Sequence, residues 1–574
     1  CFTTFTRSIG PVCISEEHFD SSLITKTPTC MPDLAANNHA EEYLKSCMEA
    51  QDSCGGVIEC QVTGILVGLG DPVFEKLDAN LAKALVSIGS VKAFEIGEGV
   101  NVSNLKGSEN NDSFYNNNGV IQKRTNHSGG TLGGISDGST LIMRAHIKPT
   151  PSIFSSQETV DKDGNVLTNT PIWMDTRAKN ICEELNEKIG AEKIFAVAGN
   201  PFQPSYATAK IIWYQRNLPE IYEKIDKILQ SNSFIAYKLT GNMTQDVSQG
   251  YGFHCFDMHT GTWNDEMCEL LGISRKILPE IYPCHAVIGK VTEEAAKVCG
   301  LAAGTPVVAG GLDAACGTLG TGVVHSGETQ EQGGQAGGMS ICTDTYKADP
   351  RMILSFHVVP DCWLLQGGTT GGGGVMRWFE REFADFEREE GKRVDKSSLE
   401  LLNEIAEKVA PGCDGLIFLP YMSGERSPIW DPDAKGVFYG LDFSKTKGHF
   451  VRAAMEGVAL SLKHNLDVAK EAGAEVSVLR AMGGSANSIL WTQIKSDITG
   501  KPIVVPSSDT ATTLGAAILA GVGIGMYKDF EEAVELTVEN KRFHEPNPEN
   551  YTIYEKNYEI YLELYNQLKE TMKK

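Results

Sequence analysis

A lone carboxylate, Asp313, follows a short apolar strand at 306–310 and precedes a run of small residues that opens a helix at 314–317. Ligands of open α/β sheets bind at the carboxyl ends of strands, and a carboxylate placed there can accept the proton of a substrate hydroxyl during phosphoryl transfer. Asp is also a favoured N-cap residue. These residues alone therefore favour a helix cap and leave the general base as the alternative.

A glycine-rich stretch at 332–338 lies between two segments that are expected to be extended. Glycine allows a positive φ and a close approach, so the backbone N–H groups of such a hairpin can contact phosphate oxygens. A simple turn is the commoner reason for this composition.

Two further glycine clusters each run into a helix. One spans 367–374 and leads into 375–379, and the other spans 482–488 between an apolar strand and a helix over 489–499. The N-terminus of a helix favours anions and polar ligand edges. Tight packing of a strand against a helix is the alternative explanation for both.

The front of the chain carries a different set of polar loops. Segments at 97–99, 107–112 and 126–134 contain the residue types that hold a phosphate, and His127 in the last is either a general acid or an ordinary hydrogen-bonding loop residue. Apolar side chains at helical spacing predict an amphipathic helix over 72–87.

The elements that must position these residues change character along the chain. Residues 101–138 are rich in Asn, Gly and Ser with little periodicity, whereas from 175 onward charged helices, such as those expected over 178–188 and 207–216, alternate with short apolar strands. The polar stretch 157–168 reads as a tight turn. We place a join at residue 163, between a front segment and an α/β protein.

Length and composition limit the functional classes. With 574 residues, 41% hydrophobic and 22% charged, the chain is long enough for at least three domains. A formal net charge of −23 argues against nucleic acid, and neither a signal peptide nor a membrane span is visible, so a cytoplasmic protein is expected. The fifteen cysteines are scattered along the chain, which favours reduced thiols over disulfides. The sequence contains no CxxC pair that would indicate a zinc site. Because the first thirty residues show no clear start of a domain, we expect a truncated front end.

From about residue 163 the chain resembles the FGGY carbohydrate kinase family, most closely its xylulokinase branch. Order and spacing agree over the remaining chain. The residues that carry the resemblance are Trp173–Arg177, Gly311–Asp313, Ser423–Pro428, Lys435–Leu441, Gly483–Gly500 and Thr513–Ala517.

This resemblance implies an actin-like (ribonuclease H-like) α/β fold of two lobes, here with an incomplete first lobe over 163–325 and a nucleotide-binding lobe over 326–574. It makes Asp313 the general base, reversing the preference for a helix cap, and places Asp175, Arg177 and Asp313 at the sugar. The implied ATP-binding residues are Gly334, Gln335, Gly337, Gly373, Gly484, Asn487 and Ser488.

Two departures from the family bear on activity. The family's second hairpin reads Gly-Thr-Ser-Gly, but here Gln335 and Ala336 replace the two hydroxyl residues. The family also begins with an Asp-x-Gly-Thr phosphate hairpin and a Met-His pair near the sugar, and neither precedes residue 163. We therefore expect phosphorylation to be impaired.

The front segment, 1–162, resembles part of chorismate synthase, an α+β enzyme that uses reduced FMN to eliminate phosphate from a shikimate-pathway ester. The match rests on the segments 68–74, 92–97, 126–134 and 148–150. The family's opening Gly-Glu-Ser-His-Gly motif and its Arg-Ser-Ser flavin contacts are missing. The resemblance implies as FMN neighbours Gly89, Ser90, Gly133, Lys148, Pro149, Thr150, Pro151 and Ser152.

Three interpretations follow. The first is an ATP-dependent kinase that phosphorylates a ketose such as xylulose, with MgATP and a small sugar as ligands, a homo-oligomer also being compatible. The second is chorismate synthase, with FMN relevant only if the front segment functions. The third is a non-catalytic fusion of the two, genuine or created during sequence assembly. We favour the first; the sequence does not identify the sugar.

Overall fold

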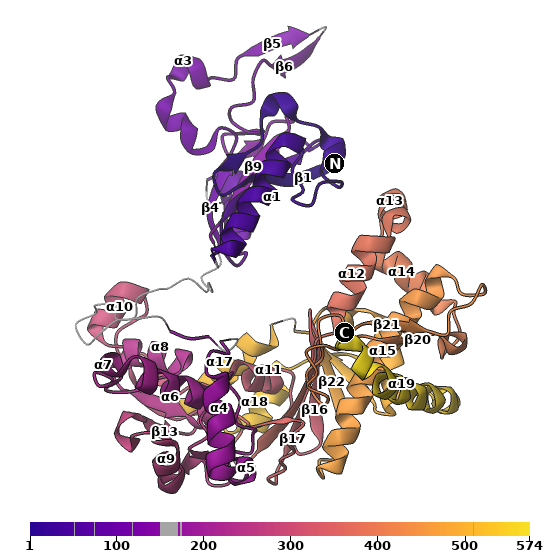
Figure 1. Cartoon of the computed structure of the whole chain (residues 1–574). Helices are drawn as coiled ribbons and strands as arrows, with labels where there is room; N and C mark the ends of the chain where they lie inside the picture. Colours follow the sequence, from indigo (N-terminus) through magenta and orange to yellow (C-terminus); the bar gives the residue numbers. More distant parts are fainter. Residues whose placement is uncertain (51, 74, 118, 150–169, 173–174, 509) are drawn as a thin grey trace. The chain divides into compact units, whose positions relative to one another are not determined.

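In the computed structural model, residues 1–574 are described except for 51, 74, 118, 150–169, 173–174 and 509 (Figure 1). The chain forms two compact units, Cys1–Ile172 and Trp173–Lys574. The join expected at residue 163 and the turn around it lie outside the described residues. No helix in the described part is both long enough and apolar enough to cross a membrane. The fifteen cysteines are all free thiols, as their spacing predicted.

Unit 1 (Cys1–Ile172) is built on a five-stranded antiparallel sheet in the order β2-β1-β3-β9-β4. Helices α1 and α2 cover it through two apolar clusters, one around Phe5 and Ala40 and the other around Val62 and Leu141. Short elements fill the loops. The bounds are β1 (Phe2–Ile9), β2 (Val12–Cys13), α1 (Leu34–Glu49), β3 (Gly56–Val62), α2 (Leu77–Val86), β4 (Val91–Ile96), α3 (Gly107–Asn110), β5 (Phe114–Asn117), β6 (Val120–Lys123), β7 (Thr131–Leu132), β8 (Ile135–Ser136) and β9 (Leu141–Ile147).

A network of ion pairs crosses the central strands of this sheet. Glu59 on β3 lies opposite Arg144 on β9 and accepts hydrogen bonds from Arg144 Nε and Arg7 Nη1, both at 2.7 Å. Phe5 is in register with Glu59, so the ion pairs and the cluster around Phe5 and Ala40 share one face of the sheet. The cluster around Val62 and Leu141 occupies the other face, because Val62 lies three residues from Glu59 on β3.

The helix expected over 72–87 is shorter in the structure, where α2 begins at Leu77. Asp71 and Glu75 exchange two backbone hydrogen bonds, of 2.9 and 3.0 Å, and so form a tight turn in place of the first helical turn. Leu81 and Leu85 pack against the sheet as their spacing indicated, whereas Val73 is 70% exposed.

Unit 2 (Trp173–Lys574) begins with a predominantly helical region up to residue 325. Its strands pair only as two-stranded sheets in the described residues. The helices are α4 (Lys179–Leu185), α5 (Ala191–Ala198), α6 (Ala207–Asn217), α7 (Pro219–Tyr222), α8 (Ser231–Thr240), α9 (Asp265–Leu271), α10 (Glu293–Cys299) and α11 (Asp313–Gly320). The strands are β10 (Thr244–Asp246), β11 (Phe256–Asp257), β12 (Thr262–Trp263), β13 (Glu280–Tyr282), β14 (Val287–Lys290) and β15 (Pro306–Val308).

The rest of unit 2 is built on a seven-stranded sheet in the order β18-β19-β17-β16-β22-β23-β24, with β16, β22 and β23 parallel to one another (Figure 1). Its strands are β16 (Glu328–Gly333), β17 (Gly337–Thr343), β18 (Ile353–Phe356), β19 (Trp363–Thr369), β22 (Val478–Met482), β23 (Ile503–Pro506) and β24 (Asn540–His544). The pair β20 (Ile417–Leu419) and β21 (Val437–Tyr439) lies apart. The helices are α12 (Gly373–Phe383), α13 (Asp385–Val394), α14 (Ser398–Glu407), α15 (Lys447–Glu471), α16 (Ile489–Thr499), α17 (Ala511–Gly523), α18 (Phe530–Thr537) and α19 (Tyr551–Met572).

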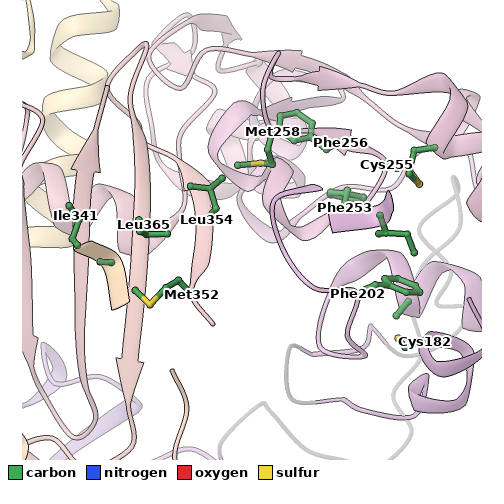
Figure 2. Packing of buried hydrophobic residues seen from close by; sticks show 14 of the residues in the cluster. Cys182, Phe202, Phe253, Cys255, Phe256, Met258, Ile341, Met352, Leu354 and Leu365 are labelled. Carbon is green, nitrogen blue, oxygen red and sulfur yellow. The ribbon is translucent and has the colours of Figure 1, made fainter. Parts of the chain in front are cut away.

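One apolar cluster joins the helical region of unit 2 to this sheet (Figure 2). Phe253 and Phe256 belong to the same buried cluster as Ile341 of β17 and Leu354 of β18. The Asn200 side chain also donates to Leu354 O at 2.8 Å and accepts from Leu354 N at 2.9 Å, as a neighbouring strand would. The two regions of unit 2 therefore share one core, which fixes the elements that carry the site.

Candidate active site

The parallel strands β16 and β22 end side by side at the carboxyl edge of the seven-stranded sheet. Gln332 is in register with Met482, so the glycines that follow, Gly333 and Gly483, are neighbours. Gly483 has φ of 86°, and a Cβ there would lie 2.9 Å from Gly333 O. Only glycine permits this left-handed turn at such a close approach. The edge is where ligands of open α/β sheets bind.

The glycine-rich hairpin between β16 and β17 rests on the start of α12. Gly373 N donates to Gly334 O at 2.7 Å, and Gly374 N donates to Gln335 O at 2.9 Å. The structure thus brings together four predicted ATP-binding residues, namely Gly334, Gln335, Gly337 and Gly373. The N–H groups of Gly373 and Gly374 are used to hold the hairpin.

The third glycine cluster follows β22 at the same edge. A 3-10 helix spans Gly484–Asn487, and Ser488 caps α16 by accepting from Trp491 N at 3.1 Å. Gly484 and Asn487 are exposed to solvent. Three more of the predicted ATP-binding residues, Gly484, Asn487 and Ser488, therefore lie at the carboxyl end of β22, although the Ser488 oxygen already serves as a helix cap.

Asp313 is the first residue of α11, but Leu312 is the N-cap of that helix. The described contact of the Asp313 carboxylate is with its neighbour Ala314 N, at 2.7 Å, and the residue is exposed. The helix-cap interpretation is therefore wrong. Burial chiefly, and then the charge of Asp313, raise the pKa of the Tyr251 hydroxyl, whereas the charge of Arg426 lowers it.

A buried relay holds the backbone just before Asp313. Asp246, which is fully buried, accepts from Ser248 Oγ at 2.5 Å, and Ser248 Oγ accepts from Leu312 N at 2.8 Å. Thr318 Oγ1 on α11 donates to Gln330 Oε1 on β16 at 2.8 Å. The helix that begins with Asp313 is thereby fixed to the strand that ends in the hairpin.

Asp175 and Arg177 lie just before α4 and bond to each other. Arg177 Nη2 is 2.8 Å from Asp175 Oδ2, and the guanidinium lies 4.8 Å from the centre of the Trp213 ring. The pKa of Lys210 on α6 is lowered to about 8 by burial, an effect that Asp175 opposes. No contact of the described residues joins Asp175 or Arg177 to Asp313.

The FMN candidates of unit 1 do not converge on one spot. Lys148 N donates to Ser90 O at 2.9 Å, so Lys148 lies beside the Gly89–Ser90 turn that follows α2. Gly133 lies near the opposite end of α2, because its neighbour Gly134 accepts from Leu77 N at 2.8 Å. A ten-residue helix separates the two groups by about 15 Å. Pro149 follows Lys148, while Thr150, Pro151 and Ser152 lie outside the described residues. The described candidates therefore form no common cradle for a flavin.

Several residues that support the site were given no role from the sequence. Glu425 is buried and accepts from Thr369 Oγ1 at 2.6 Å and from Thr370 N at 2.8 Å. Burial raises the pKa of Glu425. Ser427 Oγ accepts from Gly368 N at 2.5 Å. The Ser423–Pro428 motif therefore anchors the Gly367–Gly374 segment, a role that only its match to the family could have signalled.

No group of three or more His, Cys, Asp or Glu side chains in the described part of the chain is arranged to hold a metal ion. A sheet edge with three glycine-rich segments, together with an exposed carboxylate at the start of a helix bonded to the same sheet, is the arrangement of a nucleotide-dependent phosphotransferase.

Comparisons with known proteins define the class further. Models of the FGGY family of carbohydrate kinases match residues 153–320 (N-terminal domain) and 315–524 (C-terminal domain). A gluconokinase of Bacillus licheniformis is 31% identical over 431 residues, covering 74% of this chain and 84% of the relative. A xylulose kinase of Staphylococcus epidermidis is 31% identical over 415 residues, covering 72% and 80%. Among solved structures, xylulose kinase from Rhodospirillum rubrum matches with a TM-score of 0.66 at 28% identity, covering 73% of this chain and 84% of that one.

The chain belongs to the FGGY family of carbohydrate kinases, and unit 2 has the family's actin-like two-lobed fold. The front segment is of another origin. The chorismate synthase model matches residues 2–180, and chorismate synthase of Agathobacter rectalis is 58% identical over 163 residues. That match covers 28% of this chain and 44% of the relative, so the chain spans less than half of a chorismate synthase. The two families' models overlap at 153–180, around the join expected from the sequence.

Proposed function

We propose that this protein transfers the γ-phosphoryl group of MgATP to a hydroxyl of a ketose such as xylulose, with Asp313 as general base. The observation that carries this proposal is the exposed Asp313 carboxylate, which caps no helix and stands on a helix bonded to β16. In the reaction the carboxylate would accept the hydroxyl proton while that oxygen attacks the γ-phosphorus and ADP leaves.

The second hairpin supports the nucleotide half of the proposal. The hairpin keeps its backbone N–H donors, but Gln335 and Ala336 supply no hydroxyl donors. The glycine edge at 483–488 is the candidate adenosine site, and the magnesium ion would arrive as part of the MgATP substrate.

We further propose that turnover is slow because no Asp-x-Gly-Thr hairpin precedes residue 163. Phosphoryl transfer depends on positioning and on stabilising the charge that develops around the phosphoryl group. Losing one such electrostatic element commonly costs a factor on the order of a hundred or more.

Calorimetry with ATP and a coupled assay of sugar-dependent ADP release on the same preparation test the proposal. We expect ATP binding, together with slow ADP release in the presence of xylulose. Gluconate is the matched alternative substrate, because a gluconokinase and a xylulose kinase are equally similar to this chain. Faster turnover with gluconate would show that the substrate is an aldonic acid rather than a ketose. Absence of ATP binding would refute the proposed kinase activity. Rapid turnover would instead refute the impairment.

A further inference from the structure

A buried ion pair lies at the base of the glycine-rich hairpin between β16 and β17. Lys495 Nζ on α16 is 2.6 Å from Glu331 Oε1 on β16, and the two residues are 2% and 3% exposed. Lys495 Nζ also donates to Ser485 Oγ at 2.8 Å. Placing two charges inside a protein is costly unless their geometry is good and their other polar atoms are satisfied. The cost of burying this pair beside the candidate site suggests that it has a role there.

The pair contacts two of the three glycine-rich segments. A Cβ on Gly333, where the hairpin begins, would lie 1.5 Å from Ser485 Oγ and 3.1 Å from Lys495 Nζ. Ser485 itself belongs to the 3-10 helix of the candidate adenosine loop. Lys495 therefore joins the base of the hairpin to that loop from below.

The third glycine segment meets the same network through Asn465 on α15. Asn465 is 2% exposed, and its Oδ1 lies 2.4 Å from where a Cβ of Gly367 would stand. Its Nδ2 donates to Ser461 O at 3.0 Å. Asn465 Oδ1 and Glu331 Oε2 are both buried and have no hydrogen-bond partner among the described residues.

These unpartnered atoms belong to residues that line one small cavity. Glu331, Lys495, Asn465 and Gly367 all contribute to the wall of a space of about 10 Å³. A buried water needs roughly this much room and two to four polar partners. One water could donate to Glu331 Oε2 and to Asn465 Oδ1 and accept the third N–H of the Lys495 ammonium.

We propose that Lys495, Glu331, Asn465 and one buried water form a positioning network that locks the three glycine-rich segments into a single rigid frame. The network contacts no substrate. It acts through Gly333, Ser485 and Gly367 on the backbone that the proposed function assigns to ATP, and the link to ATP rests on that proposed function. A rigid frame of backbone N–H groups supplies the positioning that the hairpin lost with its two hydroxyl side chains.

Hydrogen exchange measured by mass spectrometry on the full-length protein tests the frame without any ligand. In Lys495→Met, amide exchange should become faster by at least about tenfold at 333–337, 367–374 and 483–488, because local opening determines exchange. The matched control is Arg452→Met, which breaks another buried pair, Arg452–Glu456 at 2.8 Å, on α15. The control should lower the melting temperature and leave exchange at the three segments unchanged.

The double variant Lys495→Met with Glu331→Gln separates positioning from stability. Removing both charges avoids an unpaired buried carboxylate, so much of the melting temperature should return. Exchange at the three segments should nevertheless stay fast. If exchange returned to wild-type rates together with the melting temperature, the network would be merely structural and the proposal would be overturned.

A milder variant guards against a failure to fold. Ser485→Ala removes one hydroxyl and should speed exchange at 333–337 and 483–488 but not at 367–374, which depends on Asn465. Unchanged exchange at all three segments in both Ser485→Ala and Lys495→Met would refute the frame. A crystal structure should show the water between Glu331, Lys495 and Asn465, and a dry cavity would refute that part of it.

The same variants connect the frame to nucleotide binding. Calorimetry should give an ATP dissociation constant at least about tenfold weaker in Lys495→Met and in the double variant, with Arg452→Met close to wild type. Wild-type protein that binds no ATP would refute the proposed function, while the exchange experiment would still decide the frame.

Discussion

Asp313 differs from an ordinary helix-capping aspartate in the hydrogen bond that its carboxylate accepts. A capping side chain accepts from an N–H two or three residues further on, whereas the described hydrogen bond of the Asp313 carboxylate is with the next residue, and Leu312 occupies the N-cap position. The buried Asp246–Ser248–Leu312 relay fixes the backbone before it. The backbone next to the carboxylate is therefore fixed, while the residue itself is exposed to solvent.

At this scale we predict the effect of Asp313→Asn in a chain whose first lobe has been completed with the family's Asp-x-Gly-Thr hairpin. The amide cannot accept the hydroxyl proton, so sugar-dependent ADP release should fall by a factor of at least about a hundred. ATP affinity, measured by calorimetry on the same variant, should stay within a few-fold. Turnover within about tenfold of the parent, or about 1.4 kcal/mol, would remove the base assignment.

Among the elements, the hairpin and the start of α12 are in close backbone contact at the candidate nucleotide site. The hairpin carbonyls use the first N–H groups of α12, and a Cβ on Gly372 would stand 2.3 Å from the backbone carbon of Ala336. No side-chain adjustment can relieve a clash with backbone, so the hairpin and the helix must separate if a methyl group is added there.

We therefore predict that Gly372→Ala weakens ATP binding at least about tenfold, because a displacement on the order of 1 Å at a binding element has effects of that size or larger. The far-UV circular dichroism spectrum should remain that of the parent, since the change is local. Unaltered ATP affinity in a well-folded variant would show that the hairpin does not contact the nucleotide.

At the scale of the whole molecule, unit 2 contains buried histidines that resist protonation. His254 and His357 are 0% and 1% exposed, and burial lowers the pKa of each to about 4. An unfolded histidine titrates near about 6.5. Between these two values the unfolded chain binds more protons than the folded one, so acid favours unfolding.

The stability of unit 2 is accordingly expected to be complete above about pH 6.5 and to fall as the pH drops toward about 4, by on the order of 3 kcal/mol per histidine. Thermal melting at a series of pH values measures this slope. His357→Gln should flatten it, whereas His325→Gln, at an exposed position, should not. An equal slope in the parent and in His357→Gln would contradict the prediction.

Unit 1 raises a separate question at the same scale, because it corresponds to less than half of a chorismate synthase. Its sheet has an apolar core, yet Leu66, Val67 and Val100 are 73%, 72% and 75% exposed. Apolar surface left uncovered in this way is typical of an interface or of a fragment.

We predict that residues 1–162 bind FMN weakly or not at all. The described candidates lie at opposite ends of α2, and the Arg-Ser-Ser flavin contacts of the family are absent from the sequence. Titration followed by flavin fluorescence should show no saturation at low micromolar concentration. Saturable quenching in that range would mean that the segment is a working flavin site.

The sequence by itself determined the two origins of this chain, the glycine segments and the boundaries of helices such as 489–499, because local periodicity and motif spacing carry that information. It also predicted the short strand before Asp313, which the structure has as β15 and which ends at Val308 rather than at residue 310. Only the tertiary structure decided that Leu312 caps α11 and that α2 starts at Leu77, since Leu312 N donates to Ser248 Oγ and Leu77 N donates to Gly134 O, both distant along the chain. The roles of Glu425 and Lys495 likewise needed the fold, because their partners are 56 and 164 residues away along the chain, and no local pattern records a contact at that separation.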